Sequence, residues 1–237
     1  MLVLCGAASV CAQTVTFTGR VTDQNTGQGI AGVAVIAEGN QTGTRVAVSD
    51  AQGNYNLPLG SNTNIKVRAY RTLYFFNPVL VGYSSVGGFP ITGGITRDFS
   101  GATLPFPILI FAQAPILLTE DESLNLLTLD NVLQVRDPLA TTNDSYFGSD
   151  KRTRLTLFLV DLDLFSGETV SIISVAALDA QQLAHNLPVE DLRKVPGVPW
   201  LSQLTVRLAN DLTGPAELSV TVTARGLTSN AAKVHLK

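Results

Sequence analysis

Cysteine, histidine and charge are all scarce in this chain of 237 residues. The two cysteines, Cys5 and Cys11, lie close together at the N-terminus, so the rest of the chain can build neither a disulfide scaffold nor a cysteine-based zinc site. The two histidines, His185 and His235, are too far apart to give a histidine pair at metal-binding spacing. With 15% charged residues and a mean hydropathy of +0.24, the composition also excludes an intrinsically disordered chain.

The charge pattern and the apolar runs exclude two further classes. The 16 basic residues are scattered apart from the cluster Lys151-Arg152-Thr153-Arg154, and nucleic-acid binding requires a basic stripe that neutralises phosphates. The longest apolar run, 104–118, is broken by three prolines and falls short of the roughly 18 residues that a transmembrane helix requires. We therefore predict no nucleic-acid partner and no transmembrane segment.

Motifs for catalysis are missing as well. The stretch 82–87 (Gly-Tyr-Ser-Ser-Val-Gly) does not fit a nucleophile elbow, and neither a phosphate-binding loop nor a dinucleotide glycine motif occurs. A lone histidine gives no catalytic triad, and His235 is expected to be a rim residue on a terminal strand. We predict that the protein is not an enzyme and has no catalytic, cofactor-binding or metal-binding residues.

The N-terminus is typical of a processing signal. Residues 2–11 are small and apolar, and Val10-Cys11-Ala12 supplies short side chains before a cleavage site at Gln13. This pattern indicates that 1–12 is a signal peptide remnant without its charged start, and it predicts a secreted or cell-surface protein; the alternative is a first core strand. A lipid anchor at Cys11 is not expected, because lipidation signals place a small residue where Val10 stands.

Alternating apolar and polar residues predict short strands at 14–23, 55–59 and 65–69, and two further strands are expected at 33–37 and 44–49. Turn residues separate these strands; Asp50-Ala51-Gln52-Gly53 is typical of a tight turn in which glycine takes a positive φ. Strands at this spacing are characteristic of a sandwich or barrel. Tyr55 is expected to point into the core with its hydroxyl near the rim.

Three motifs occur in order within these strands. They are Gly19-Arg20-Val21-Thr22-Asp23, then Gly29-Ile30-Ala31-Gly32-Val33-Ala34-Val35, then Ser49-Asp50-Ala51-Gln52-Gly53-Asn54-Tyr55-Asn56-Leu57. Together they resemble the carboxypeptidase regulatory-like (prealbumin-like) module over residues 14–69. The resemblance implies a small Greek-key β-sandwich that serves as a structural, spacer or binding unit, and Gly32 tightens the start of its second strand. Residues 13–114 are assigned to this first domain, with 104–112 as its last strand.

The segment 70–99 is rich in aromatic residues and glycine, and long loops of this kind are often functional. One interpretation is a hairpin whose aromatic rings lie in the core. The other is an aromatic contact surface for a polymer or a partner. The candidate surface consists of Tyr70, Tyr74, Phe75, Phe76, Tyr83 and Phe89.

The second domain is predicted to begin at Pro115 and to cover residues 115–237. Strands are expected at 126–129, 132–135, 154–160, 169–176, 203–208, 217–224 and 231–236, with one short helix-like stretch at 179–184. The stretches 195–206 and 212–230 are similar to the C-terminal Ig-like (IPT-like) sandwich of large bacterial exported proteins. The resemblance implies a structural or adhesive role, and Trp200 is expected to close the end of the sandwich.

Paired acidic residues are the remaining candidates for chemistry. Asp161 and Asp163 are two apart on an expected strand and share one face. They could perform glycosidase acid–base work or bind calcium with Glu168, but the favoured interpretation is the solvated side of an edge strand. The acidic turn 120–122 is a second, weaker calcium candidate.

The sequence therefore predicts an all-β protein with two β-sandwich domains in tandem, a Greek-key prealbumin-like domain and then an Ig-like domain. The predicted function is that of a non-catalytic, exported structural or interaction protein, an adhesion-type module whose partners are other surface proteins or polysaccharide. The alternative function is carbohydrate binding through the aromatic segment 70–89.

Overall fold

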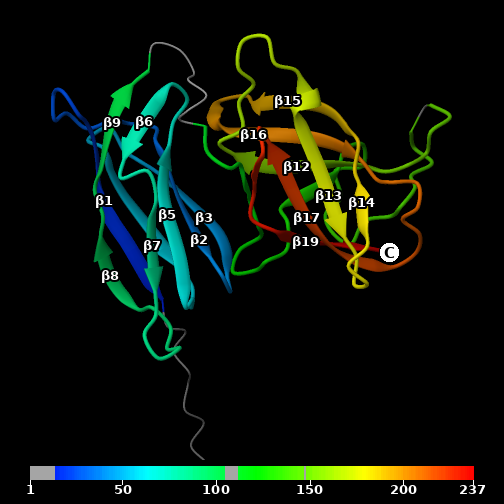
Figure 1. Cartoon of the computed structure of the whole chain (residues 1–237), viewed down its shortest axis with the longest axis horizontal. Helices are drawn as coiled ribbons and strands as arrows, with labels where there is room; N and C mark the ends of the chain where they lie inside the picture. The colour runs from blue at the N-terminus through cyan, green and yellow to red at the C-terminus, as the bar shows by residue number, and fades with distance from the viewer. Residues whose placement is uncertain (1–13, 105–111, 147) are drawn as a thin grey trace, which may run out of the picture.

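Two β-sandwiches lie side by side in the computed structural model, which describes residues 14–104, 112–146 and 148–237 (Figure 1). Strands β1 to β9 form the first sandwich, and β10 to β19 form the second. Each sandwich has its own cluster of buried apolar side chains. The predicted fold class, all-β with two sandwiches in tandem, is confirmed. That the chain divides into separate units at residue 115 stays a prediction.

The first sandwich packs a five-stranded sheet on a four-stranded sheet. In the first sheet, β1 pairs with β4 on one side and with β8 and then β9, in parallel, on the other side. The second sheet has the order β3-β2-β5-β7. The strands are β1 (Val15–Asp23), β2 (Ala34–Gly39), β3 (Gly43–Val48), β4 (Asn54–Leu59), β5 (Asn64–Tyr70), β6 (Tyr74–Asn77), β7 (Val81–Ser84), β8 (Gly93–Thr96) and β9 (Phe99–Thr103).

The local predictions for β4 and its turn are confirmed. Asp50 Oδ1 accepts hydrogen bonds from the backbone N–H groups of Gln52 and Asn54 at 2.9 and 2.8 Å, and Gly53 has a φ of 83°. Tyr55 follows this turn; its ring is buried, and its hydroxyl donates to the carbonyl of Arg97 at 2.5 Å. The phenol therefore fills the core without leaving its polar end unpaired.

The second sandwich packs the sheet β10-β12-β16-β15, with β11 beside β12, on the sheet β14-β13-β17-β18, with β19 beside β17. A single 3-10 turn, η2 (Val170–Ile172), precedes β13, and no described helix has the length and apolar character needed to cross a membrane. The strands are β10 (Ile116–Leu117), β11 (Thr128–Asp130), β12 (Arg154–Val160), β13 (Ile173–Leu178), β14 (Ala184–Asn186), β15 (Val189–Val195), β16 (Val198–Arg207), β17 (Ala216–Ala224), β18 (Leu227–Thr228) and β19 (Ala232–Leu236).

Two predicted elements of the second half are wrong, and aspartate capping explains both. The stretch 132–135 is a turn and not a strand, because Asp130 Oδ1 accepts from the N–H groups of Val132 and Leu133, both at 2.8 Å. The helix-like stretch 179–184 is the turn of the β13–β14 hairpin, in which Asp179 Oδ1 accepts hydrogen bonds from the N–H groups of Gln181 and Leu183, both at 2.9 Å. The predicted strand 104–112 lies largely outside the described residues, and the last described strand of the first sandwich is β9.

Each histidine of the second sandwich lies between two carboxylates. His185 on β14 is buried, with Nδ1 2.8 Å from Asp211 and Nε2 3.2 Å from Asp179. The hydrogen bond to Asp211, helped by the one to Asp179, raises the pKa of His185 above its ordinary value. The imidazolium form therefore links the β13–β14 turn to the loop after β16.

His235 on β19 is held in the same way. Its Nδ1 lies 2.6 Å from Asp137 and its Nε2 3.3 Å from Glu217. The hydrogen bond to Asp137 is the main cause that raises the pKa of His235. Both histidines therefore bind a proton more tightly in the folded protein than in the unfolded chain, where the pKa is about 6.5.

We expect the melting temperature to fall as the pH rises above the ordinary histidine pKa of about 6.5. A raised histidine pKa gives stability that is complete below the unfolded pKa and is lost as the pH passes the folded pKa. The double variant His185→Asn, His235→Asn should flatten this dependence, because asparagine does not titrate. Thermal melts at intervals across this pH range test the prediction; an equally steep fall in the double variant would contradict it.

Candidate functional site

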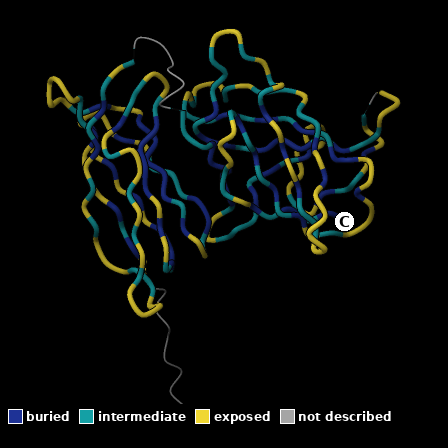
Figure 2. The backbone as a smooth tube through the Cα atoms, viewed as in Figure 1, coloured by how far each residue is buried: buried dark blue, intermediate teal, exposed yellow. Residues whose placement is uncertain are grey.

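The junction between the two sandwiches has an apolar core of its own, which we call the junction core. Ala34, Ile36 and Tyr70 from the first sandwich are buried against Ile116, Leu118 and Val160 from the second. Val46, Leu127, Phe158, Trp200 and Leu201 pack around them. In the tube of Figure 2, the strands of the first sandwich that lie nearest the second are largely buried, and the facing edge of the second is mostly of intermediate burial. Trp200 was expected to close a sandwich end; it packs instead against the junction core.

Strand β2 has two buried faces, and this explains its sequence. Val33, Val35 and Ala37 point into the core of the first sandwich, whereas Ala34 and Ile36 between them point into the junction core. A strand buried on both faces has a continuous apolar run in place of alternation. The run 33–37, predicted only as a strand, is therefore also the sequence signal for the junction.

A pair of threonines fixes the register of the junction. The backbone N–H of Thr44 donates to Oγ1 of Thr119, and the N–H of Thr119 donates to Oγ1 of Thr44, both at 2.8 Å. Gly43 stands beside them with a φ of 71°, and a Cβ there would lie 2.1 Å from Thr119 Oγ1. The close approach of β3 to the second sandwich therefore requires glycine at this position.

An arginine and an aspartate form an ion pair across the junction. Arg68 on β5 has a side chain that is 6% exposed, and its Nη1 lies 3.3 Å from Asp161 Oδ2. The same guanidinium donates to Gln113 Oε1 at 2.9 Å and to the carbonyl of Ala114 at 2.6 Å. Burial raises the pKa of Asp161 to about 6, and the charge of Arg68 acts against that rise. Among the nearby cations, Arg68 acts most strongly to keep the buried Asp161 ionised.

Asp163 makes the second set of contacts across the junction. Its carboxylate accepts hydrogen bonds from the hydroxyls of Tyr70 and Thr72 at 2.5 and 3.1 Å. Lys194 on β15 places its Nζ 2.5 Å from the other oxygen and 5.5 Å from the centre of the Tyr70 ring. Burial, and then the charge of Asp163, raise the pKa of Tyr70 well above its ordinary value, so its hydroxyl is a permanent donor here.

A third ion pair lies beside Asp161 and Asp163, within the second sandwich. Arg225 forms an ion pair with Glu168, and its guanidinium lies 3.8 Å from the centre of the Phe165 ring. Arg225 Nη2 also donates to the backbone carbonyl of Asp163 at 2.5 Å. The hydrogen bond from Arg225 lowers the pKa of Glu168. The Glu168 carboxylate is therefore paired with Arg225 and does not join Asp161 and Asp163 in a calcium site.

The solvated edge-strand interpretation of Asp161 and Asp163 is wrong. Strand β12 ends at Val160, Asp161 has a φ of 61°, and both aspartates turn into the junction. Three cationic side chains stand against three carboxylates in this group, so the net field does not favour a calcium ion. In the described part of the chain, no group of three or more histidine, cysteine, aspartate or glutamate residues could hold a metal ion.

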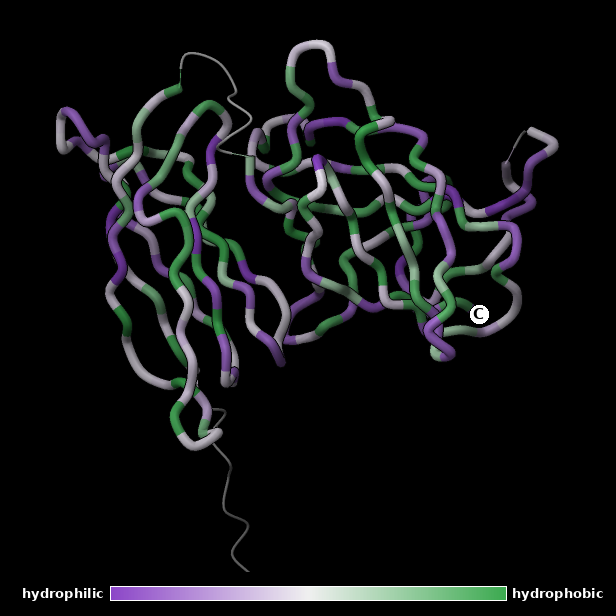
Figure 3. Tube along the Cα trace, in the orientation of Figure 1, coloured by the Kyte–Doolittle hydropathy of each residue, from purple (hydrophilic) through white to green (hydrophobic). Residues whose placement is uncertain are grey.

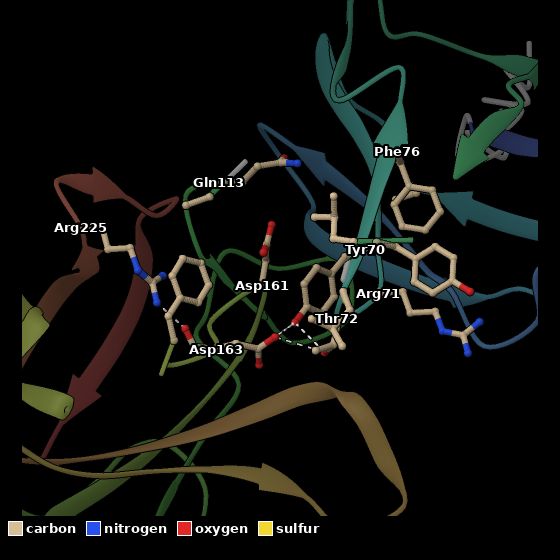
Figure 4. Close-up of a pocket in the computed structure, with 14 residues that line it drawn as sticks. Tyr70, Arg71, Thr72, Phe76, Gln113, Asp161, Asp163 and Arg225 are labelled. Carbon is tan, nitrogen blue, oxygen red and sulfur yellow. Dashed lines mark hydrogen bonds between the residues drawn. The ribbon is translucent and has the colours of Figure 1, made fainter. Parts of the chain in front are cut away.

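A small cavity separates these charged groups. Its volume is about 80 Å³, and Tyr70, Gln113, Asp161, Asp163 and Arg225 contribute to its wall (Figure 4). One water needs roughly 10–15 Å³ by this measure, so the space suits a few waters and not a sugar chain. The arrangement can hold charges in fixed pairs; it does not present a nucleophile beside a general base.

The structure places the six predicted surface aromatics in three environments. Tyr70 is buried in the junction, and Phe76 is buried in the core of the first sandwich. Tyr74 and Tyr83 are partly buried against that core, and the ring centroids of Tyr83 and Phe17 are 5.2 Å apart. Phe75 is also partly buried. Phe89 is 75% exposed. The six rings therefore form no single exposed row, and ligand binding by this set stays a prediction.

Comparisons with known proteins give distant likenesses only. No protein-family model and no curated protein sequence matches the chain, so the two family resemblances stay predictions. Among solved structures, the chain is similar to BcpA, the major pilin subunit of Bacillus cereus, with 8% identity and a TM-score of 0.30 over 95% of this chain and 70% of that one.

Two further solved structures are similar at the same level. For the surface layer protein SbsC, domains 4–9, the identity is 13% and the TM-score 0.24, with 92% of this chain and 29% of that chain covered. For the Bacillus anthracis TIE protein the identity is 7% and the TM-score 0.26, with 94% and 48% covered. At such TM-scores these likenesses carry no argument about function.

Proposed function

We propose that the chain is a non-catalytic structural and interaction protein of the cell exterior, in which two β-sandwiches form one rigid unit. The junction carries this proposal: its apolar core, the Arg68–Asp161 ion pair and the Tyr70–Asp163 hydrogen bond join the two sandwiches. Export rests on the predicted leader 1–12. Ion pairs and apolar packing between the sandwiches suit a load-bearing or spacing element.

The junction should resist separation because undocking would break its apolar contacts and its ion pair together. Undocking would expose Ile36 and Tyr70 to water and would move Arg68 away from Asp161. Domains within one chain usually move unless the interface between them is large and apolar. An apolar centre with charge pairs at its margin therefore favours a fixed angle between the sandwiches.

Carbohydrate binding through residues 70–89 is the second candidate function. The observation that favours it is Phe89, whose ring is exposed at a loop tip. A single ring is a smaller stacking platform than the row that the sequence suggested. We therefore rank the structural role first.

Distance measurements between two spin labels test the rigid unit. With Cys5 and Cys11 replaced by serine, labels at Asn56 on β4 and Ser174 on β13, both exposed, should give one narrow distance distribution. Labels at Ser174 and Glu190, both in the second sandwich, supply the width expected for a rigid pair. A distribution between sandwiches that is much broader than this control would contradict the proposed rigid unit.

A further inference from the structure

Strand β7 is the edge of the sheet β3-β2-β5-β7, and β5 is the only described strand that pairs with it (Figure 1). The register of this pair continues to Ser85, whose N–H donates to the carbonyl of Thr63 at 2.8 Å. Hydrogen-bonded and non-bonded residues alternate along an antiparallel pair. The N–H and C=O groups of Gly82 and Ser84 therefore point away from β5, along the open edge of the sheet.

Two longer edge strands carry features that discourage the addition of a further strand. Strand β15 is rich in charged side chains, and β4 contains Pro58. The N–H of Val21 donates to the carbonyl of Gly53 at 2.8 Å, so by the same alternation Pro58 stands at an outward position and supplies no N–H there. Charge and proline are common protections of sheet edges. Strand β7 has neither, because the chain carries no charged residue between Arg71 and Arg97 and β7 contains no proline.

Exposed apolar side chains flank this open edge. Leu80, just before β7, is 48% exposed, and Val86, after its end, is 91% exposed. Alternation along an extended chain places both on one face of the sheet, with small residues between them. In Figure 3 the ends of the segment 79–86 have the hydrophobic colour and its middle is pale. Leu80 also lines a groove of about 360 Å³, together with Leu227 of the second sandwich.

We propose that β7 pairs antiparallel with β7 of a second copy of the chain, so that the two sheets become continuous. In one register Gly82 lies opposite Ser84 of the second copy, and both outward N–H groups of each edge donate to the outward carbonyls of the other. The same register sets Leu80 opposite Val86 of the second copy, and two-fold symmetry repeats this contact at the other end. Val86 of each copy then reaches the groove beside Leu80 of the other.

The edge fits a second copy because it is complementary to itself. Sliding one strand by two residues would set Leu80 opposite Ser84 and would separate it from Val86. Identical edges that carried charge would repel each other, and this edge carries none. One strand pair with an apolar contact at each end is smaller than a standard interface, so the dimer is weak and forms at high protein concentration. This surface is separate from the junction, and the proposal does not depend on the structural role.

Sedimentation equilibrium of the full chain tests the proposal. With Cys5 and Cys11 replaced by serine, the average mass should rise from monomer toward dimer as the protein concentration approaches about 1 mM. Leu80→Lys should raise the dissociation constant roughly tenfold or more, because the ammonium group loses water against Val86 of the second copy. Leu133→Lys is the matched control, since Leu133 is 51% exposed in a turn of the second sandwich, and it should change nothing. A chain that stays monomeric, or an equal effect of the control, would overturn the proposal.

A charge pair tests the register itself. Val86→Glu should weaken the dimer as Leu80→Lys does, and the double variant Leu80→Lys, Val86→Glu should restore it, because opposite charges then face each other between the copies. Gly82→Pro removes an outward N–H, as Pro58 does on β4, and should also raise the dissociation constant; circular dichroism checks that each variant is folded. If the double variant is no better than the single ones, or if a folded Gly82→Pro chain dimerises unchanged, β7 is not the interface and the proposal fails.

Discussion

Replacing Arg68 by methionine is expected to lower the free energy of unfolding by roughly 3–5 kcal/mol at pH 7.5. The variant keeps most of the apolar stem but removes the cation that lies 3.3 Å from Asp161. The carboxylate then stays in the junction without its partner, and an uncompensated charge in a desolvated place is costly. Urea denaturation followed by circular dichroism measures the difference.

The pH dependence of this loss identifies its cause. Burial raises the pKa of Asp161 to about 6, and a raised carboxyl pKa means that the folded state prefers the protonated form. The contribution of Asp161 to stability is therefore greatest below the unfolded pKa of about 4 and falls as the pH rises through 6. At pH 5 Asp161 is mainly neutral, so Arg68→Met should cost much less there than at pH 7.5.

Two controls accompany the variant. Arg193→Met removes an arginine whose side chain is 71% exposed, and it should cost less than about 1 kcal/mol. The double variant Arg68→Met, Asp161→Asn should recover much of the loss, since neither charge remains. If Arg68→Met behaves like Arg193→Met, or costs the same at both pH values, the ion pair does not stabilise the junction.

The sequence was informative where a strand had one buried face. Strands β1 and β4 alternate apolar and polar residues, and their limits were predicted closely because the alternation ends at turn residues. Strand β15 was missed because it is an edge strand that carries Glu190, Asp191, Arg193 and Lys194, and its residues are only partly buried or exposed. The strands β6 to β8 were not predicted individually, because aromatic and glycine residues interrupt the alternation in this segment.

The junction could be predicted only in part. The run 33–37 was predicted only as a strand, and its sequence does not identify the surface that covers its second face. Asp161 and Asp163 were identified from the sequence as an acidic pair. Because Leu162 and Leu164 continue the apolar–polar alternation after β12, the sequence does not indicate that the strand ends at Val160. Tyr70 and Asp163 are 93 residues apart in sequence, and only the docked sandwiches bring them together.

Neighbouring residues of β2 provide the second test with a large expected effect. Ile36 is fully buried in the junction core, and Val35 is fully buried in the core of the first sandwich. An unpaired aspartate at either position costs several kcal/mol because the carboxylate loses its water. Ile36→Asp should separate the sandwiches while both stay folded, whereas Val35→Asp should unfold the first sandwich.

Small-angle scattering and circular dichroism distinguish these outcomes. For Ile36→Asp we expect a larger radius of gyration with the β-sheet signal retained, because undocking relieves the buried charge at the expense of the junction alone. For Val35→Asp we expect loss of part of the β-sheet signal, because no docking change can bring that side chain to water. Ile36→Val, which removes one methyl group, should cost only about 0.5–1.5 kcal/mol and leave the radius unchanged. If Ile36→Asp unfolds the chain as Val35→Asp does, the two sandwiches are one cooperative unit, and the junction core is part of the fold itself.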